Sequence, residues 1–148
     1  MQSLQELGLD PQTVLNWSPA VTYVTEVSAQ SRLVFVSQSV KSVLGYSAEK
    51  FLSTPGFLTS LVHPEDINSI EESLRIAADY GAAIRDRRLR VASGEYRWYR
   101  DTFRIERNAS GDVRFGIGTI VDVTEEKSVH RALEARTEEY RILADHSS

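Results

Sequence analysis

Alternation of apolar and polar side chains marks five segments of the chain as β-strands. Residues 20–27, AVTYVTEV, are rich in β-branched and aromatic side chains, and residues 33–36, LVFV, repeat that character after a short polar turn. These two strands are predicted to form a hairpin. Three further strands are predicted over residues 84–91, 96–106 and 113–123, and turns that contain glycine separate them.

The last predicted strand carries two glycines, Gly116 and Gly118, on one face. A glycine inside a strand indicates a bend or a close approach by a neighbouring group. We therefore expect either a close approach by another part of the protein on that side or a bend in the strand. The apolar side chains of this strand share the opposite face: Val113, Phe115, Ile117 and Val121.

Helical periodicity appears between the second and third strands. Residues 38–46 and 47–52 are predicted to form short helices, and Ser47 is the expected N-cap of the second. A longer helix is predicted from Pro64 to about Tyr80, because proline and acidic residues suit a helix N-terminus. Its buried stripe is predicted to consist of Ile67, Ile70, Leu74, Ala77 and Ala78.

The predicted element order is β-β-α-α-α-β-β-β. It indicates an α/β (α+β) fold, in which a five-stranded antiparallel sheet has its helices inserted between strands two and three. Two short helical pieces are predicted before the sheet and a charged helix after it. We therefore divide the chain into an N-terminal helical cap over residues 1–19, a central domain over residues 20–124 and a helical linker over residues 125–148.

The C-terminal helix carries apolar side chains at the spacing of a coiled coil. Their separations of four, seven and three residues match the a and d positions of a heptad, and Arg136 occupies the core position between them. Such a short seam is marginal by itself, so we expect a parallel homodimer to which the domain and its N-terminal helix add contacts. The predicted seam consists of Val129, Leu133, Tyr140 and Leu143.

The bulk composition limits the classes of function. The chain has 148 residues, a formal net charge of −4 and no cysteine. Disulfides, thiolate nucleophiles, iron–sulfur clusters and cysteine-linked chromophores are therefore excluded. The negative charge does not favour nucleic acid or an anionic membrane as a partner. Because neither a membrane-spanning run nor a signal peptide is visible, the chain is predicted to be cytoplasmic, without direct membrane contact.

Three stretches of the sequence together resemble a PAS domain. They are VFVSQSVKSVLGYSAEKF, LVHPED and RLRVASGEYRWYRDTFRIERNASGDVRFGIGTIVDVTEEK. The resemblance covers about residues 20–127. It implies a sensory or regulatory module of a larger signal-transduction protein, with a histidine kinase or cyclic-dinucleotide-type effector downstream. It also implies that the junction of the last strand with the following helix transmits the signal through Asp122 and Thr124, and Thr124 is the expected N-cap of that helix.

A ligand of such a domain would lie between the long helix and the inner face of the sheet. The side chains expected there are mostly apolar, so the ligand is expected to be small and apolar or aromatic. A second interpretation stays open, in which these side chains fill the space and the domain is a ligand-free dimerisation and spacer module. The predicted lining residues are Tyr23, Phe35, Phe57, Ile70, Leu74, Trp98 and Ile117.

No cofactor is predicted. The long helix contains no histidine, so histidine-ligated haem is not expected, and non-covalent flavin is kept as a minor alternative. His63 is interpreted as a partner in a local hydrogen bond and His130 as a solvated helix position. The three histidines lie far apart in the sequence, so no metal site is predicted. No catalytic motif is visible, and the chain is predicted not to be an enzyme by itself.

Strands three and four are rich in arginine, which allows two interpretations. A basic sheet face could bind an anion or nucleic acid. Acidic residues are interleaved with the arginines, however, so we favour a solvated face with cross-strand ion pairs. The arginines are Arg85, Arg87, Arg88, Arg90, Arg97, Arg100, Arg104 and Arg107.

Overall fold

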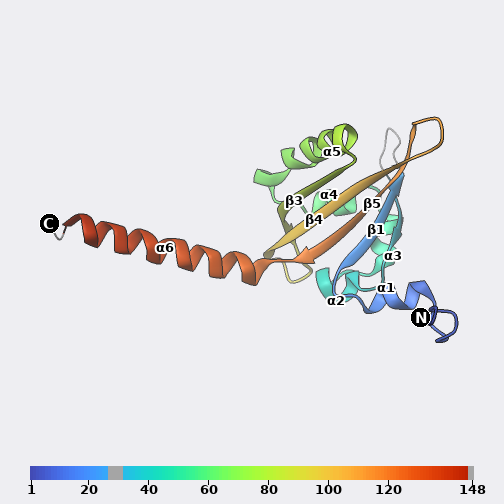
Figure 1. Ribbon diagram of the computed structural model, residues 1–148, viewed down its shortest axis with the longest axis horizontal. Coiled ribbons are helices and arrows are strands. Elements are labelled where there is room, and N and C mark those ends of the chain that lie inside the picture. Colours follow the sequence, from blue (N-terminus) through green and yellow to red (C-terminus); the bar gives the residue numbers. More distant parts are fainter. Residues whose placement is uncertain (27–31, 147–148) are drawn as a thin grey trace.

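A five-stranded antiparallel sheet organises the protein (Figure 1). A computed structural model describes residues 1–26 and 32–146 and places the strands in the order β2-β1-β5-β4-β3. The predicted sheet is confirmed, whereas residues 27–31 of the predicted hairpin turn lie outside the described residues. The strands are β1 (Val21–Glu26), β2 (Leu33–Val36), β3 (Ala82–Arg90), β4 (Tyr96–Arg107) and β5 (Val113–Asp122).

The helices between β2 and β3 lie on one face of this sheet (Figure 1). Ser47 caps one of them, as predicted, because its side chain accepts a hydrogen bond from the Lys50 amide. Gly45 and Gly81 each follow a helix with a positive φ, of 89° and 90°, which ends the helix at little steric cost. The inserted elements are α2 (Val40–Leu44), α3 (Ala48–Ser53), α4 (Phe57–Ser60), the 3-10 turn η1 (Pro64–Asp66) and α5 (Asn68–Tyr80).

The buried line of α5 differs from the predicted stripe. Ser69, Ser73 and Ala77 are buried, whereas Ile67 and Leu74 are exposed. The two serines face the sheet because an arginine side chain from β3 lies beneath them and bonds to both. Small polar residues thus occupy positions that an apolar stripe would otherwise fill.

The N-terminal cap contains one α-helix rather than two. Residues 4–8 form turns, and α1 (Pro11–Trp17) begins at the predicted Asp10-Pro11 start. The Asp10 carboxylate accepts hydrogen bonds from the amides of Gln12 and Thr13 at 2.7 and 3.3 Å. No residue of α1 is buried, and Trp17 is 82% exposed. The cap is therefore a peripheral element that contributes little to the core.

The C-terminal helix α6 (Thr124–His146) extends away from the sheet (Figure 1). It begins after β5, as predicted from the change in periodicity, and its first turns contact the domain. No helix in the described part of the chain combines the length and the apolar composition needed to cross a membrane.

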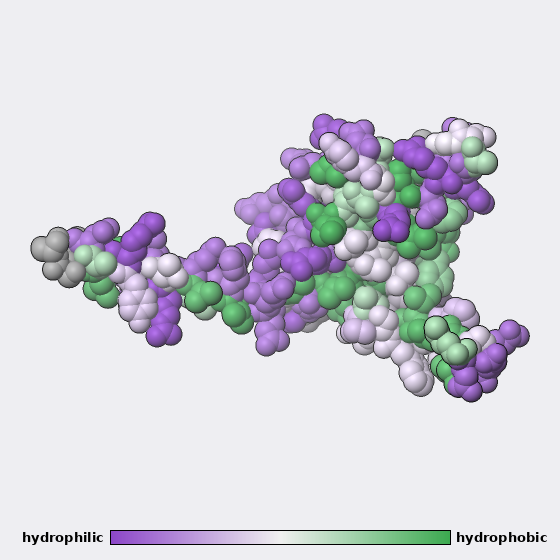
Figure 2. All heavy atoms as spheres, viewed as in Figure 1, coloured by the Kyte–Doolittle hydropathy of each residue, from purple (hydrophilic) through white to green (hydrophobic). Residues whose placement is uncertain are grey.

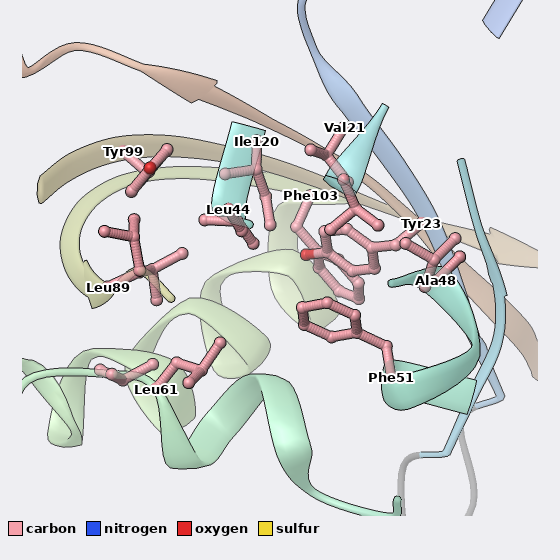
Figure 3. Packing of buried hydrophobic residues seen from close by; sticks show 14 of the residues in the cluster. Val21, Tyr23, Leu44, Ala48, Phe51, Leu61, Leu89, Tyr99, Phe103 and Ile120 are labelled. Atoms are coloured by element: carbon pink, nitrogen blue, oxygen red, sulfur yellow. The ribbon is translucent and has the colours of Figure 1, made fainter. Parts of the chain in front are cut away.

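The inner face of the sheet packs against the inserted helices to form the core. Figure 3 shows Tyr23 and Phe103 side by side on the sheet, with Phe51 of α3 opposite them. These two sheet rings stack, with centroids 6.4 Å apart. A Cβ at Gly118 would overlap the Tyr23 ring, and a Cβ at Gly116 would overlap the Phe103 ring. The close approach predicted from the strand glycines is confirmed.

Candidate functional site

A cavity of about 280 Å³ lies between the inner sheet face and the helices α3, α4 and α5. Its volume is close to the lower end of known small-molecule sites, roughly 300 Å³. Four of the predicted lining residues, Tyr23, Phe57, Ile70 and Leu74, do line it. Other apolar side chains complete the wall, notably Phe51, Leu58, Leu89, Phe103, Ile105 and Ile120.

Three of the predicted lining residues, Phe35, Trp98 and Ile117, lie on the opposite face of the sheet. Phe35 pairs with Val24, and Val24 pairs with Ile117, so these three side chains share the outer face. Trp98 follows the same rule, because it neighbours the buried, inward-facing Tyr99 on β4. The prediction that they line the cavity was wrong. Alternation shows which residues of a strand share a face, but it does not show which of the two faces is buried.

One arginine of β3, Arg87, points into the protein and forms the polar end of the cavity. It is 6% exposed, and its Nη1 donates to Asp101 Oδ2 at 2.8 Å. Its Nε donates to Ser69 Oγ at 2.8 Å, and its Nη2 donates to Ser69 O and Ser73 Oγ at 3.0 and 2.6 Å. The guanidinium therefore ties α5 to β4 across the inner face.

The Asp101 carboxylate joins Arg87 to the aromatic part of the cavity. Its Oδ1 accepts a hydrogen bond of 2.8 Å from the Tyr23 hydroxyl. Burial raises the pKa of Asp101, and burial together with the neighbouring carboxylate raises the pKa of Tyr23 well above its usual value. Tyr23, Arg87 and Asp101 all line the cavity and form a polar corner in a mainly apolar wall, to which Thr25, Arg32 and Thr59 add polar side chains.

The arginines of β3 and β4, predicted to share one solvated face, lie on both faces of the sheet. The pairing of Asp86 with Arg100 directly across the strands confirms the predicted cross-strand ion pair on the outer face. Arg87 was missed. The sequence did contain a signal for it: Arg87 lies an even number of residues from the apolar residues Ala83 and Leu89 on β3, so the three side chains share one face.

Asp122, the last residue of β5, and Thr124, the first residue of α6, connect the sheet to the helix. The Thr124 hydroxyl accepts a hydrogen bond of 2.9 Å from the Trp98 amide and donates one of 3.3 Å to the Trp98 carbonyl. The Asp122 carboxylate accepts a hydrogen bond from the Thr124 amide at 2.9 Å and one from Arg97 Nε at 3.0 Å. Burial acts to raise the pKa of Asp122, but these bonds outweigh it and hold the pKa below its usual range.

The predicted N-cap role of Thr124 was wrong in its detail. Thr124 is the first residue of α6, and its hydroxyl bonds to β4. Asp122 instead accepts the hydrogen bond from the first amide of the helix. The two residues therefore fix α6 to two neighbouring strands rather than only stabilising its first turn.

The outer-face residue Trp98 contacts the first two turns of α6. Its ring lies 5.2 Å from Lys127 Nζ and 5.7 Å from the Arg131 guanidinium carbon, and Arg88 of β3 lies 5.0 Å from it. Lys127 also forms an ion pair of 2.8 Å with Asp86. These contacts, with that of Arg100 and Glu126 at 3.2 Å, hold the start of the helix against β3 and β4.

The HPED stretch, residues 63–66, is attached to β3 by hydrogen bonds. The Nδ1 of His63 accepts a hydrogen bond of 3.0 Å from the Glu65 amide, which is the kind of local bond predicted for this histidine. The Asp66 carboxylate accepts hydrogen bonds from the Arg88 amide and guanidinium at 2.9 to 3.0 Å. These bonds from Arg88 lower the pKa of Asp66.

The predicted seam residues lie exposed on α6. Val129, Leu133, Tyr140 and Leu143 are each about 60% exposed. Figure 2 shows hydrophobic side chains at intervals along this projecting helix, between hydrophilic ones. Their partner in a dimer remains a prediction. Among the described residues, no group of three or more His, Cys, Asp or Glu side chains is placed to hold a metal ion.

Comparison with known proteins decides the family. The sequence model of the family described as the PAS fold matches residues 33–120. The chain belongs to the PAS family. Its fold is shared by the sensory box histidine kinase/response regulator of Burkholderia thailandensis, with a TM-score of 0.68 and 24% identity over 88% of this PAS chain and 96% of that one.

Two curated relatives of this PAS chain are sensors. It is 25% identical over 122 residues to the methyl sulfide methyltransferase-associated sensor of Methanosarcina acetivorans, which covers 81% of the chain and 12% of that relative. It is 28% identical over 138 residues to the two-component sensor PprA of Pseudomonas aeruginosa, with 92% and 15% covered. The chain thus spans less than a sixth of either relative, and these matches support a sensory PAS module of a signalling protein.

Proposed function

We propose that this PAS module senses a small molecule in the cavity between sheet and helices and transmits its presence to α6. One observation carries the proposal: the polar corner of the cavity and the attachment of α6 are built from consecutive residues of the same two strands. Arg87 and Asp101 face the cavity, while their chain neighbours Asp86 and Arg100 hold Lys127 and Glu126 of α6.

Strand geometry explains how the two faces are coupled. Because side chains alternate across a sheet, a shift of β3 at Arg87 also moves Asp86 and Arg88 on the outer face. On β4, a shift at Asp101 likewise moves Arg100. A ligand that contacts the polar corner would therefore change the ion pairs at the start of α6. The ligand can shift the equilibrium between two arrangements of α6 only by the difference between its binding free energies for them.

α6 would carry the change to a following domain. The chain covers 12% and 15% of its two curated relatives, which are named as sensors, and this supports a place within a longer signalling protein. We propose a histidine kinase or cyclic-dinucleotide-type effector as the partner domain in the same chain. The exposed seam of α6 supports a homodimer in which two such helices run side by side.

A dimerising spacer without a ligand is the competing function. Two observations favour it: the cavity is small, and within the described residues every buried polar side-chain atom already has a hydrogen-bond partner. In this interpretation α6 and the domain dimerise, and the cavity is a packing defect.

Native mass spectrometry of the purified chain, with an absorbance spectrum, separates these functions. A sensor is expected to retain or take up one small molecule per chain, and its binding should change hydrogen exchange in the first turns of α6. Ile70→Trp should fill part of the cavity and abolish both effects while the domain stays folded. A chain that binds nothing, or whose α6 does not respond to a bound molecule, would support the spacer. A haem or flavin band would contradict the prediction of no cofactor.

A further inference from the structure

The polar corner of the cavity is electrically balanced. Arg87 is buried, and its guanidinium lies 2.8 Å from the Asp101 carboxylate, so a positive and a negative charge face the cavity together. An anionic ligand approaching Arg87 would also meet Asp101, and a cationic ligand approaching Asp101 would meet Arg87. In either case the ligand would lose its hydration without gaining an unopposed partner charge, which is unfavourable in a buried site.

The balanced corner nevertheless retains capacity for hydrogen bonding. A guanidinium has five N–H groups, and four bonds from Arg87 to described residues are formed, by Nε, by Nη1 and twice by Nη2. The second N–H of Nη1 is left as a donor. Each carboxylate oxygen of Asp101 accepts one bond, from Tyr23 or from Arg87, and can accept another. The corner thus offers a donor and acceptors side by side.

The rest of the cavity is mainly apolar; Thr25, Thr59 and Arg32 also line it, and Arg32 has its own counter-charge in Glu26 at 3.9 Å. Its walls are made mainly of aliphatic and aromatic side chains, with Phe51, Phe57 and Phe103 among them. A volume of about 280 Å³ corresponds to about nine water-sized groups, at about 30 Å³ each. A single substituted ring or a short branched chain would fill this volume.

We infer that the cavity takes a neutral, compact, mostly apolar molecule that carries one group able both to donate and to accept a hydrogen bond, such as a carboxamide or an alcohol. The apolar part lies among the phenylalanines, and the polar group meets Arg87 and Asp101. This inference rests on the proposed sensory function and specifies the chemistry of its ligand.

Four probes of similar size test the inference by isothermal titration calorimetry: benzamide, benzoate, benzamidinium and toluene. The first three share one planar shape and differ in charge. Benzamide is expected to bind at least ~10-fold more tightly than benzoate or benzamidinium, and several-fold more tightly than toluene, which lacks the hydrogen-bonding group. Tighter or equal binding of benzoate would show that Arg87 acts as an anion site, and equal binding of toluene would show that the polar corner does not contact the ligand.

Charge variants provide a second test. Asp101→Asn leaves Arg87 without its counter-charge, so the preference should shift by at least ~10-fold from benzamide toward benzoate. Asp10→Asn is the matched control, because Asp10 lies in the peripheral N-terminal cap and does not line the cavity. A wild-type preference that both variants leave unchanged would overturn the inference.

The outcomes also separate the inference from the proposed function. Binding with the wrong preference refutes the ligand class and leaves the sensory function standing. If none of the four probes binds, the inferred ligand class is refuted, and native mass spectrometry of the purified chain decides the sensory function separately. If binding survives Ile70→Trp, the cavity is not the ligand site and both proposals fail. The wild-type series decides the matter even if Asp101→Asn does not fold.

Discussion

Gly118 lies directly beneath the aromatic ring of Tyr23, so that a Cβ at position 118 would overlap the ring carbons and the hydroxyl oxygen. The two residues are cross-strand partners on β5 and β1. The missing side chain allows Tyr23 to lie flat over the sheet, stacked with Phe103, and to reach Asp101 with its hydroxyl. A glycine in one strand thereby sets the shape of the cavity and of its polar corner.

Gly118→Ala should therefore destabilise the domain. The added methyl group must displace the Tyr23 ring, and overpacking of this kind costs typically 1–3 kcal/mol. Urea denaturation measures the change in the free energy of unfolding. Thr119→Ala, at the next position and on the outer face of β5, is the control and should cost less. Equal effects of the two substitutions would show that the Tyr23 ring moves aside freely.

Much of the architecture could be predicted from the sequence because it depends on local pattern. Alternation gives the five strands, and Gly116 and Gly118 mark the face where rings lie against the backbone. Ser47 was identified as a cap from its residue type and position. These features involve neighbours in the chain or the fixed period of a strand, so no knowledge of tertiary contacts was needed.

The candidate site was harder to predict because it depends on which face of each strand is buried. Trp98 and Ile117 are apolar but point outward, while Arg87 is charged but points inward. Residue type favours the reverse assignment in each case. Arg87 can be buried because Ser69, Ser73 and Asp101, which lie on other elements, accept hydrogen bonds from its guanidinium.

The hydrogen bonds between Asp66 and Arg88 should make the stability of the fold depend on pH. Hydrogen bonds from Arg88 lower the pKa of Asp66, so its carboxylate stabilises the fold above about pH 4, the usual pKa of Asp, and loses this effect as the pH falls through its folded-state pKa. Asp66→Asn should cost roughly 2 kcal/mol at neutral pH, the scale of charge-assisted hydrogen bonds. The difference between wild type and variant should then shrink toward acid pH.

Stability must be compared between wild type and Asp66→Asn, because Asp101 changes the stability of both proteins with pH in the opposite direction. Burial raises its pKa, so its contribution to stability falls as the pH rises through its titration. That contribution is common to wild type and Asp66→Asn and cancels in the difference. Asp112→Asn, in an exposed turn, is the control. A wild-type advantage over Asp66→Asn that is the same at acid and neutral pH would refute the assignment.

Leu133→Glu should weaken the predicted dimer. Leu133 lies in the middle of the exposed α6 seam, and a carboxylate there would have to be desolvated between two helices. We expect the dissociation constant from sedimentation equilibrium to rise at least ~10-fold. Ala135→Glu places the same charge outside the seam and should have little effect. A wild-type chain that stays monomeric at high concentration would disprove the seam.

Thr124→Val should loosen the attachment of α6 to β4. Valine keeps the shape of threonine but removes the hydroxyl, so the Trp98 amide loses its partner, whereas the Trp98 carbonyl keeps the hydrogen bond from the Val123 amide. The loss of a hydrogen bond at this junction should cost about 1 kcal/mol, which corresponds to roughly fivefold faster amide exchange in the first turn of α6 and at Trp98. Hydrogen exchange measured by NMR resolves these amides.

A second threonine of the same helix supplies the control for this prediction. The Thr137 hydroxyl donates to the Leu133 carbonyl at 3.0 Å, entirely within α6. Thr137→Val therefore removes a hydroxyl from the helix without touching the sheet, and exchange near Trp98 should be unchanged. If Thr124→Val and Thr137→Val alter the first turn equally, Thr124 stabilises only the helix itself. If Thr124→Val alone releases it, the junction between β4 and α6 is the point at which the helix is held.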